Sequence, residues 1–172
     1  IEHSSVYETC KELEKTFGFE VTYLKVDQKG RISLQELQDS IRDDTILVSI
    51  MYVNNEIGVI NPIEEIKQIV KKYDKIKLHF DMVQALGKLP IDLTDVDLAS
   101  FSAHKIYGLK GSGLLFKRRS TTIVPLINGG QQEFGMRGGT SNACSNIVFA
   151  KTLRLALENF DNKAKHIKMI NS

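Results

Sequence analysis

The chain has 172 residues, of which 42% are hydrophobic and 26% charged, and its formal net charge is +2. This length and composition fit one globular domain with an apolar core, and the small charge gives no indication of a nucleic-acid or membrane partner. No run of about 18 apolar residues occurs that could span a membrane. The first ten residues, IEHSSVYETC, lack the basic and apolar regions of a secretory signal.

The two cysteines, Cys10 and Cys144, are far apart in the sequence and form no C-x-x-C pair. We therefore expect no metal site and no disulfide between them. Unpaired cysteines are typical of a reducing compartment, so the sequence favours a cytoplasmic protein.

The first third of the chain alternates helical and extended patterns. Apolar side chains recur at helical spacing over residues 5–17, and Gly18 can end that helix. Polar and apolar residues largely alternate over residues 20–26, which predicts a strand. The sequence SLQE at 33–36 matches a capping box and predicts a short helix that ends near Ile41.

The next two elements are a strand and a helix. Residues 45–53, TILVSIMYV, are almost wholly apolar and rich in β-branched residues, which is typical of a strand buried on both faces. Asn61 and Pro62 then offer an N-cap followed by proline at the first helical position. The buried face of this helix would carry five apolar side chains, namely Ile63, Ile66, Ile69, Val70 and Tyr73.

Three more strands are predicted further along the chain, over 76–80, 96–101 and 113–116. A glycine-rich loop follows at 129–139, and a last helix is predicted over 145–160. Strands that alternate with helices indicate an α/β fold, and we expect a three-layer sandwich built on a mostly parallel sheet.

Polar clusters fall where these predicted strands end. Ligands of such sheets bind at the carboxyl ends of the strands. The residues include an amine, a carboxylate, hydroxyls and imidazoles, which an aldehyde cofactor with a pyridine ring and a phosphate would need. Taken singly, each residue also fits an ordinary turn or a solvated surface. Their joint order favours a cofactor site, made of Asn54-Asn55-Glu56, Asp81 with Gln84, and Ser102 with His104-Lys105.

Five segments extend this pattern over nearly the whole chain. In the order and spacing found here, they resemble consecutive motifs of cysteine desulfurases, which belong to the class V aminotransferase group of pyridoxal-phosphate (PLP) enzymes. The resemblance implies the aspartate-aminotransferase fold, also called fold type I. The segments are EHSSVYETC, ILVSIMYVNNEIGVI, HFDMVQALGKLPIDL, SFSAHKIYGLKGSG and GGQQEFGMRGGT.

The resemblance assigns five residues to the cofactor ring. Lys105 would bond to the aldehyde of PLP, and Asp81 would pair with the ring nitrogen. Gln84 would hydrogen-bond the phenolic oxygen, with Asn55 near that oxygen and the substrate. His3 would stack on the ring and help to move protons, so Lys105 and His3 are the expected catalytic residues.

Three further residues are assigned to the phosphate. Ser102 and His104 would hold it within one subunit, and Thr140 would reach the phosphate of the neighbouring subunit of a homodimer. Met82-Val83 and Leu109 depart from the commonest family pattern, but neither change removes a functional group.

The resemblance also implies that residues 1–172 are only part of the PLP-binding large domain. An N-terminal phosphate loop, the catalytic cysteine, an arginine for the substrate carboxylate and a C-terminal small domain would lie outside this chain. The start at Ile1 without methionine likewise suggests a fragment. We expect the fragment alone to be inactive, and Cys144 lies too early in the pattern to be the catalytic cysteine.

The implied activity of the full-length protein converts L-cysteine to L-alanine. Sulfur would pass to a protein cysteine as a persulfide, and then to acceptor or scaffold proteins of iron–sulfur cluster assembly or tRNA thiolation. Two alternatives stay open at this point: another class V enzyme, such as a selenocysteine lyase or an aminotransferase, or an inactive truncated lobe that serves as a scaffold.

Overall fold

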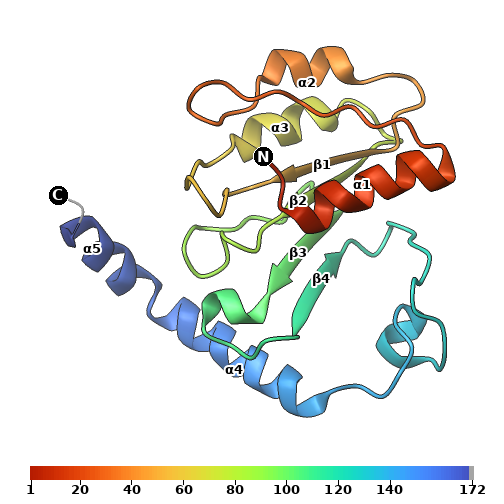
Figure 1. The fold of residues 1–172 in the computed structure, drawn as a ribbon. Coiled ribbons are helices and arrows are strands. Elements are labelled where there is room, and N and C mark those ends of the chain that lie inside the picture. The colour runs from red at the N-terminus through yellow and green to blue at the C-terminus, as the bar shows by residue number, and fades with distance from the viewer. Residues whose placement is uncertain (171–172) are drawn as a thin grey trace.

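A four-stranded sheet forms the centre of the computed structural model, which describes residues 1–170 (Figure 1). The first three strands are parallel and the fourth is antiparallel to its neighbour. This confirms an α/β fold on a mostly parallel sheet. The strands lie in chain order: β1 (Leu47–Met51), β2 (Lys77–Asp81), β3 (Leu98–Ser102) and β4 (Gly113–Lys117).

The register of the strands gives the sheet one apolar face. Ile50 pairs with Phe80, Phe80 with Ala99, and Ala99 with Phe116, so their side chains share a face. Helix α3 (Ile63–Val70) contributes to the same core through Ile63, Ile66, Ile69 and Val70. The predicted strand within residues 45–53 is confirmed as β1, but the expectation that it is buried on both faces is wrong. On the face opposite Val48 and Ile50, Leu47 is exposed and Ser49 is only partly buried.

The first helix is confirmed. Helix α1 spans Ser4–Phe17, with His3 as its N-cap and Gly18 as a left-handed C-cap at φ 71°. Figure 1 shows α1 in front of the strands, and none of its residues is fully buried. Helix α2 (Leu34–Ser40) is capped by Ser33, whose side chain accepts from the Glu36 N–H, as the capping-box pattern predicts.

Two local predictions are wrong. Residues 20–26 form no strand, and only Val26 makes an isolated bridge, with Ile32. Asp27 Oδ1 accepts hydrogen bonds from the N–H groups of Lys29 and Arg31, which closes a tight turn between Val26 and Ile32. Asn61 does not cap α3.

Pro62 occupies the N-cap position of α3 without a side-chain hydrogen bond. The Asn61 amide is buried and donates instead to the Met51 carbonyl oxygen at 2.8 Å, which ties the end of β1 to this turn. Tyr73 lies beyond the helix end at Val70 and is partly exposed, so it is not part of the buried face.

The C-terminal region contains more helix than expected. The short 3-10 helix η2 (Gln132–Gly135) lies within the glycine-rich loop. Helix α4 spans Ala143–Glu158 and is capped by Asn142, and a second helix, α5 (Phe160–Ile170), follows it. No helix within residues 1–170 combines the length and hydrophobicity that crossing a bilayer requires.

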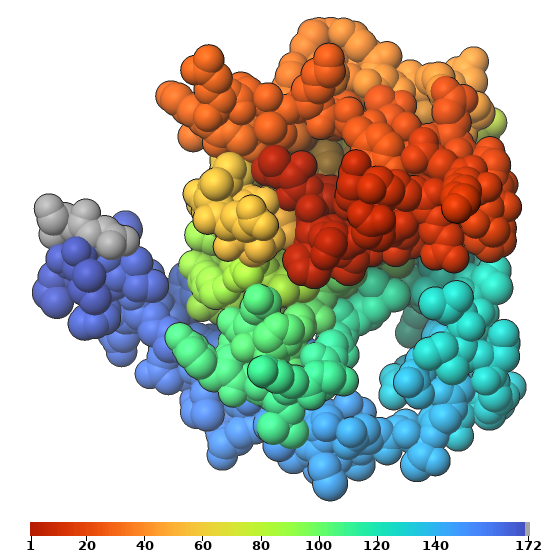
Figure 2. All heavy atoms as spheres, in the orientation of Figure 1, coloured from red at the N-terminus to blue at the C-terminus, as the bar shows by residue number. Residues whose placement is uncertain are grey.

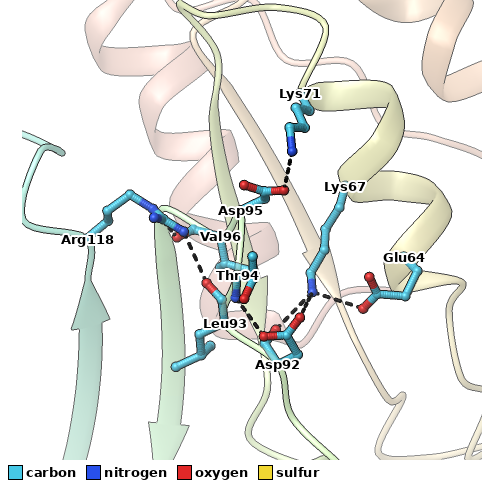
Figure 3. Close-up of polar contacts among 9 residues, drawn as sticks. All are labelled: Glu64, Lys67, Lys71, Asp92, Leu93, Thr94, Asp95, Val96 and Arg118. Carbon is cyan, nitrogen blue, oxygen red and sulfur yellow. Dashed lines mark hydrogen bonds and ion pairs between the residues drawn. The ribbon is translucent and has the colours of Figure 1, made fainter.

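A cluster of ion pairs joins α3 to the turn before β3 (Figure 3). Lys67 is only 3% exposed, and its Nζ donates to Glu64 Oε1 and to the Asp92 carbonyl oxygen, both at 2.9 Å. One turn later, Lys71 Nζ lies 2.7 Å from Asp95 Oδ2. A buried lysine is expected only where such partners offset the cost of removing its charge from water.

Candidate functional site

The carboxyl ends of β1, β2 and β3 meet at one edge of the sheet, because these strands are parallel. Met51 ends β1, Asp81 ends β2 and Ser102 ends β3. The structure therefore brings the polar clusters that follow the three strands to the same edge. The Asp81 residue is only 6% exposed there.

Asp81 is held by the turn that follows β2. The Val83 N–H donates to Asp81 Oδ1 at 3.0 Å, and the Met82 N–H donates to the Ser100 carbonyl oxygen at 3.0 Å. The Met82 side chain is fully buried in the core. This large side chain, which departs from the family pattern, therefore anchors the turn and leaves the Asp81 carboxylate in place.

Gln84 lies in the same turn, and Lys88 Nζ donates to its Oε1 at 2.6 Å. Burial lowers the pKa of Lys88, and the positive charge of Lys105 lowers it further. Sequence reasoning missed Lys88, although its i,i+4 spacing from Gln84 was a usable signal.

The 3-10 helix η1 (Ala103–Ile106) carries two of the predicted residues. Ala103 and Ile106 are buried and hold this turn against the core, whereas His104 and Lys105 are exposed. Ser102 Oγ and His104 Nδ1 are 2.8 Å apart. The hydroxyl and the imidazole thus form one polar unit at the end of β3.

The two residues before His3 attach the N-terminal segment to the end of β1 and the loop after it. Glu2 Oε1 accepts from the Met51 N–H at 2.8 Å, and Asn54 Nδ2 donates to the Ile1 carbonyl oxygen at 2.9 Å. Burial raises the pKa of Glu2, and the negative charge of Asp81 adds to the increase. Sequence reasoning did not identify Glu2, because a contact with a strand 49 positions away leaves no local pattern.

A pocket of about 430 Å³ lies beside this N-terminal segment. His3 and Asn55 both line it. Asn54 is buried, and its side-chain oxygen accepts the N–H groups of Glu56 and Ile57, which fixes the loop that carries Asn55.

A larger groove of about 860 Å³ lies between the sheet and α4, but its lining is mainly apolar, from residues such as Phe101 and Phe149. None of the predicted site residues lines that groove. The candidate site is therefore the polar sheet edge.

Thr140 does not join the other predicted residues within one chain. It precedes α4 and is exposed. The segment 120–140 extends away from the strands, and an open gap separates it from the η1 region (Figures 1 and 2). The Gly138 N–H donates to the Ile127 carbonyl oxygen at 2.9 Å, so this segment closes on itself.

The donor set at the sheet edge fits a cofactor that has an aldehyde, a basic ring nitrogen and an anionic group. The Lys105 amine could bond to the aldehyde, and the shielded Asp81 carboxylate could face a protonated ring nitrogen. Ser102 and His104 could donate to the anion, and Gln84 retains an amide N–H pair after its oxygen is bound by Lys88.

Comparison with known proteins gives one consistent family. The family model described as Aminotransferase class-V matches residues 1–171. The chain is 47% identical to a cysteine desulfurase IscS of Dictyoglomus turgidum, over 97% of this chain and 42% of that protein. It is 48% identical to the mitochondrial cysteine desulfurase of Saccharomyces cerevisiae, over 99% of this chain and 35% of that protein.

Solved structures agree with this result. A NifS-like protein superposes with a TM-score of 0.95 at 44% identity, covering 99% of this chain and 47% of that chain. A structure described as SspA in complex with cysteine gives a TM-score of 0.86 at 43% identity, over 90% of this chain and 45% of that one. The chain thus spans less than half the length of these relatives.

Proposed function

Because the chain belongs to the aminotransferase class-V family, we propose that the full-length protein is a PLP-dependent cysteine desulfurase. It converts L-cysteine to L-alanine and transfers the sulfur to a cysteine thiol of the protein, which becomes a persulfide. The observation that carries this proposal is the placement of Asp81 and Lys105 after neighbouring parallel strands at one sheet edge. The similarity to named cysteine desulfurases supports this reaction over those of a selenocysteine lyase or an aminotransferase.

PLP, when bound, supplies an electron sink for the bond that breaks in the substrate. The Lys105 amine holds its aldehyde, and the Asp81 carboxylate stabilises a proton on its ring nitrogen. Asp81 suits this role because it is shielded from water and one of its oxygens is fixed by the Val83 N–H. A charge in such surroundings acts more strongly than one in bulk water.

The remaining residues bind and move protons. Gln84 donates to the phenolic oxygen, with Asn55 beside it, and the Ser102–His104 unit donates to the phosphate. His3 Nδ1 is engaged by the Ser5 N–H and hydroxyl, so Nε2 is the ring nitrogen left to exchange a proton with the substrate.

The proposed reaction needs groups beyond this chain. We place the N-terminal phosphate loop, the catalytic cysteine, the substrate-binding arginine and the small domain in the rest of the protein. The 172-residue chain alone, as part of the large domain, should therefore be inactive.

A homodimer is part of this proposal. Three apolar side chains of the segment 120–140 are almost fully exposed, namely Val124 at 87%, Leu126 at 94% and Phe134 at 97%. Exposed apolar side chains grouped on one segment are typical of an interaction surface. A second copy that covered this segment would also bring Thr140 to the phosphate in its partner's site.

The sulfur would pass from the persulfide to acceptor or scaffold proteins of iron–sulfur cluster assembly or of tRNA thiolation. We propose the cytoplasm as the compartment, supported by the two free cysteines, Cys10 and Cys144.

The direct test measures alanine and sulfide released from L-cysteine by the full-length protein with PLP and a thiol reductant. Lys105→Ala should abolish release above the rate of free PLP. Lys110→Ala, which removes an exposed lysine five positions later, should retain it. Undiminished activity of Lys105→Ala would refute the proposed role.

A further inference from the structure

The polar face of the sheet carries a chain of three hydrogen-bonded side chains that the proposed reaction does not use. Ser49 on β1 lies opposite His79 on β2, and Ser49 Oγ is 2.8 Å from His79 Nδ1. On the other side, His79 Nε2 is 2.9 Å from Ser100 Oγ on β3. Both ring nitrogens of His79 are therefore engaged, across three adjacent strands.

This arrangement suits an uncharged imidazole. Each hydroxyl can donate or accept, so either neutral tautomer of His79 satisfies both ring nitrogens. Burial lowers the pKa of His79, although the negative charge of Asp81 opposes that shift. The neutral form is therefore favoured at neutral pH.

Two of these three hydrogen-bonded side chains, His79 and Ser100, are neighbours of Asp81. His79 precedes Asp81 by two residues on β2, so both side chains lie on the same face, with Cα atoms about 6.6 Å apart at the usual rise of a strand. Ser100 is the register partner of Asp81 on β3, and neighbouring strands are about 4.8 Å apart. A substitution at His79 would therefore remove or alter the hydrogen bond of Ser100, whose side chain lies next to Asp81.

We propose that His79 is a positioning residue for Asp81: it holds Ser100 in place beside the carboxylate and, being neutral, leaves the negative charge of Asp81 available to a protonated ring nitrogen. The inference rests on the proposed role of Asp81 as the partner of the PLP ring. A cation at position 79 would compete for that charge, and an apolar side chain would release both hydroxyls.

Three substitutions separate these effects. His79→Gln supplies a neutral amide with both a donor and an acceptor, so it can bridge the two serines. His79→Leu removes the bridge without adding charge. His79→Arg adds a permanent positive charge two residues from Asp81.

The measurement is the PLP dissociation constant of the full-length apoprotein, together with kcat, KM and the thermal unfolding midpoint. His79→Gln should stay within about threefold of the parent constant, and His79→Leu should weaken PLP binding about tenfold, the size of one lost hydrogen bond. His79→Arg should weaken binding at least as much as His79→Leu, and kcat should fall with KM little changed.

Ser49→Ala removes the hydroxyl on the side of His79 that is farther from Asp81 and leaves position 79 unchanged. We expect it to weaken PLP binding less than His79→Leu does. If His79→Leu, His79→Arg and His79→Gln bind PLP equally well, His79 has no positioning role. If PLP binding simply follows the unfolding midpoint in all variants, its role is structural and the inference is wrong.

Asp81→Asn separates this inference from the proposed function. If the parent binds PLP and Asp81→Asn loses it while His79→Leu does not, the inference alone fails. If the parent protein binds no PLP, the proposed function fails with it.

Discussion

Lys88 Nζ donates to Gln84 Oε1 at 2.6 Å, across one turn of the segment that follows β2. This contact fixes the amide of Gln84 with its oxygen toward Lys88. The NH₂ group is left to donate elsewhere, and in the proposed site its acceptor would be the phenolic oxygen of PLP. Lys88, which lies outside the predicted site, would then orient a residue within it.

We expect Lys88→Met to weaken PLP binding about threefold to tenfold, because the Gln84 amide loses the charged hydrogen bond that orients it. Lys88→Arg should retain most of the affinity, since it keeps a charged donor. Equilibrium dialysis of the full-length apoprotein with PLP measures the difference. Equal affinity for the parent and Lys88→Met would show that the contact has no influence on the cofactor.

A second prediction concerns Gly108, directly after η1. A Cβ added there would lie 2.9 Å from the Ala103 carbonyl oxygen and 3.0 Å from the Ala103 Cβ, so the η1 turn would have to move. We expect Gly108→Ala to displace Lys105 and reduce both PLP affinity and activity by about tenfold or more, as misplaced catalytic groups do.

Gly111→Ala is the matched control. Gly111 has φ +77° but no atom within 4 Å of an added Cβ, so alanine would be strained without meeting a neighbour. The expected result is a stability loss of about 1 kcal/mol with nearly unchanged PLP affinity. If Gly108→Ala and Gly111→Ala reduce PLP affinity equally, the steric explanation for Gly108 is wrong.

The third prediction concerns the buried lysine of α3. Lys67→Met removes the donor to the Asp92 carbonyl oxygen and to the Glu64 carboxylate, and should lower the free energy of unfolding by about 1–3 kcal/mol. The loss stays below that of a fully buried ion pair because both carboxylates are largely exposed.

Lys71→Met removes the exposed pair with Asp95 and should change stability by less than about 1 kcal/mol. Chemical denaturation of both variants of the full-length protein, followed by circular dichroism, compares the two sites. A larger loss for Lys71→Met would contradict the dependence on burial.

The fourth prediction concerns acid stability and Asp97, the residue directly before β3. Burial raises the pKa of Asp97, but the Leu78 N–H, the Thr121 hydroxyl and Lys77 outweigh it, and the net pKa is lowered. A lowered folded-state pKa stabilises the fold above the ordinary aspartate pKa of about 3.9, and this contribution is lost as the pH falls through the folded-state value.

Asp97→Asn should therefore destabilise the protein at neutral pH by about 1–3 kcal/mol, and the difference from the parent should shrink below about pH 4. Urea denaturation at a series of pH values measures this. The exposed Asp43→Asn serves as the control and should leave the curve unchanged. A difference for Asp97→Asn that persists at low pH would mean that its charge is not the cause.

The main strands were predictable because each is a short run rich in apolar residues, with polar residues at its end or shortly after it. Once β1, β2 and β3 are parallel, their ends must meet, so the sheet edge with Asp81 and Ser102 follows from the pattern. The assignment of individual residues to a cofactor came from the family resemblance and stays a prediction.

Features that depend on register or on long-range contacts could not be predicted from the sequence. The apparent strand at 20–26 has the right local pattern but no neighbouring strand, and Asn61 binds the end of β1 instead of capping α3. The His79 bridge exists only because β1, β2 and β3 place two serines on either side of it. No spacing within one segment encodes that contact.

The most direct test of the central claim is to identify the lysine that binds PLP in the full-length protein. Borohydride reduction in the presence of PLP, followed by peptide mass mapping, fixes the cofactor to the amine that holds it. We predict the label on Lys105, and its loss from that peptide in Lys105→Ala. Stoichiometric label on Lys88 or another lysine, with Lys105 unmodified, would contradict the proposed site.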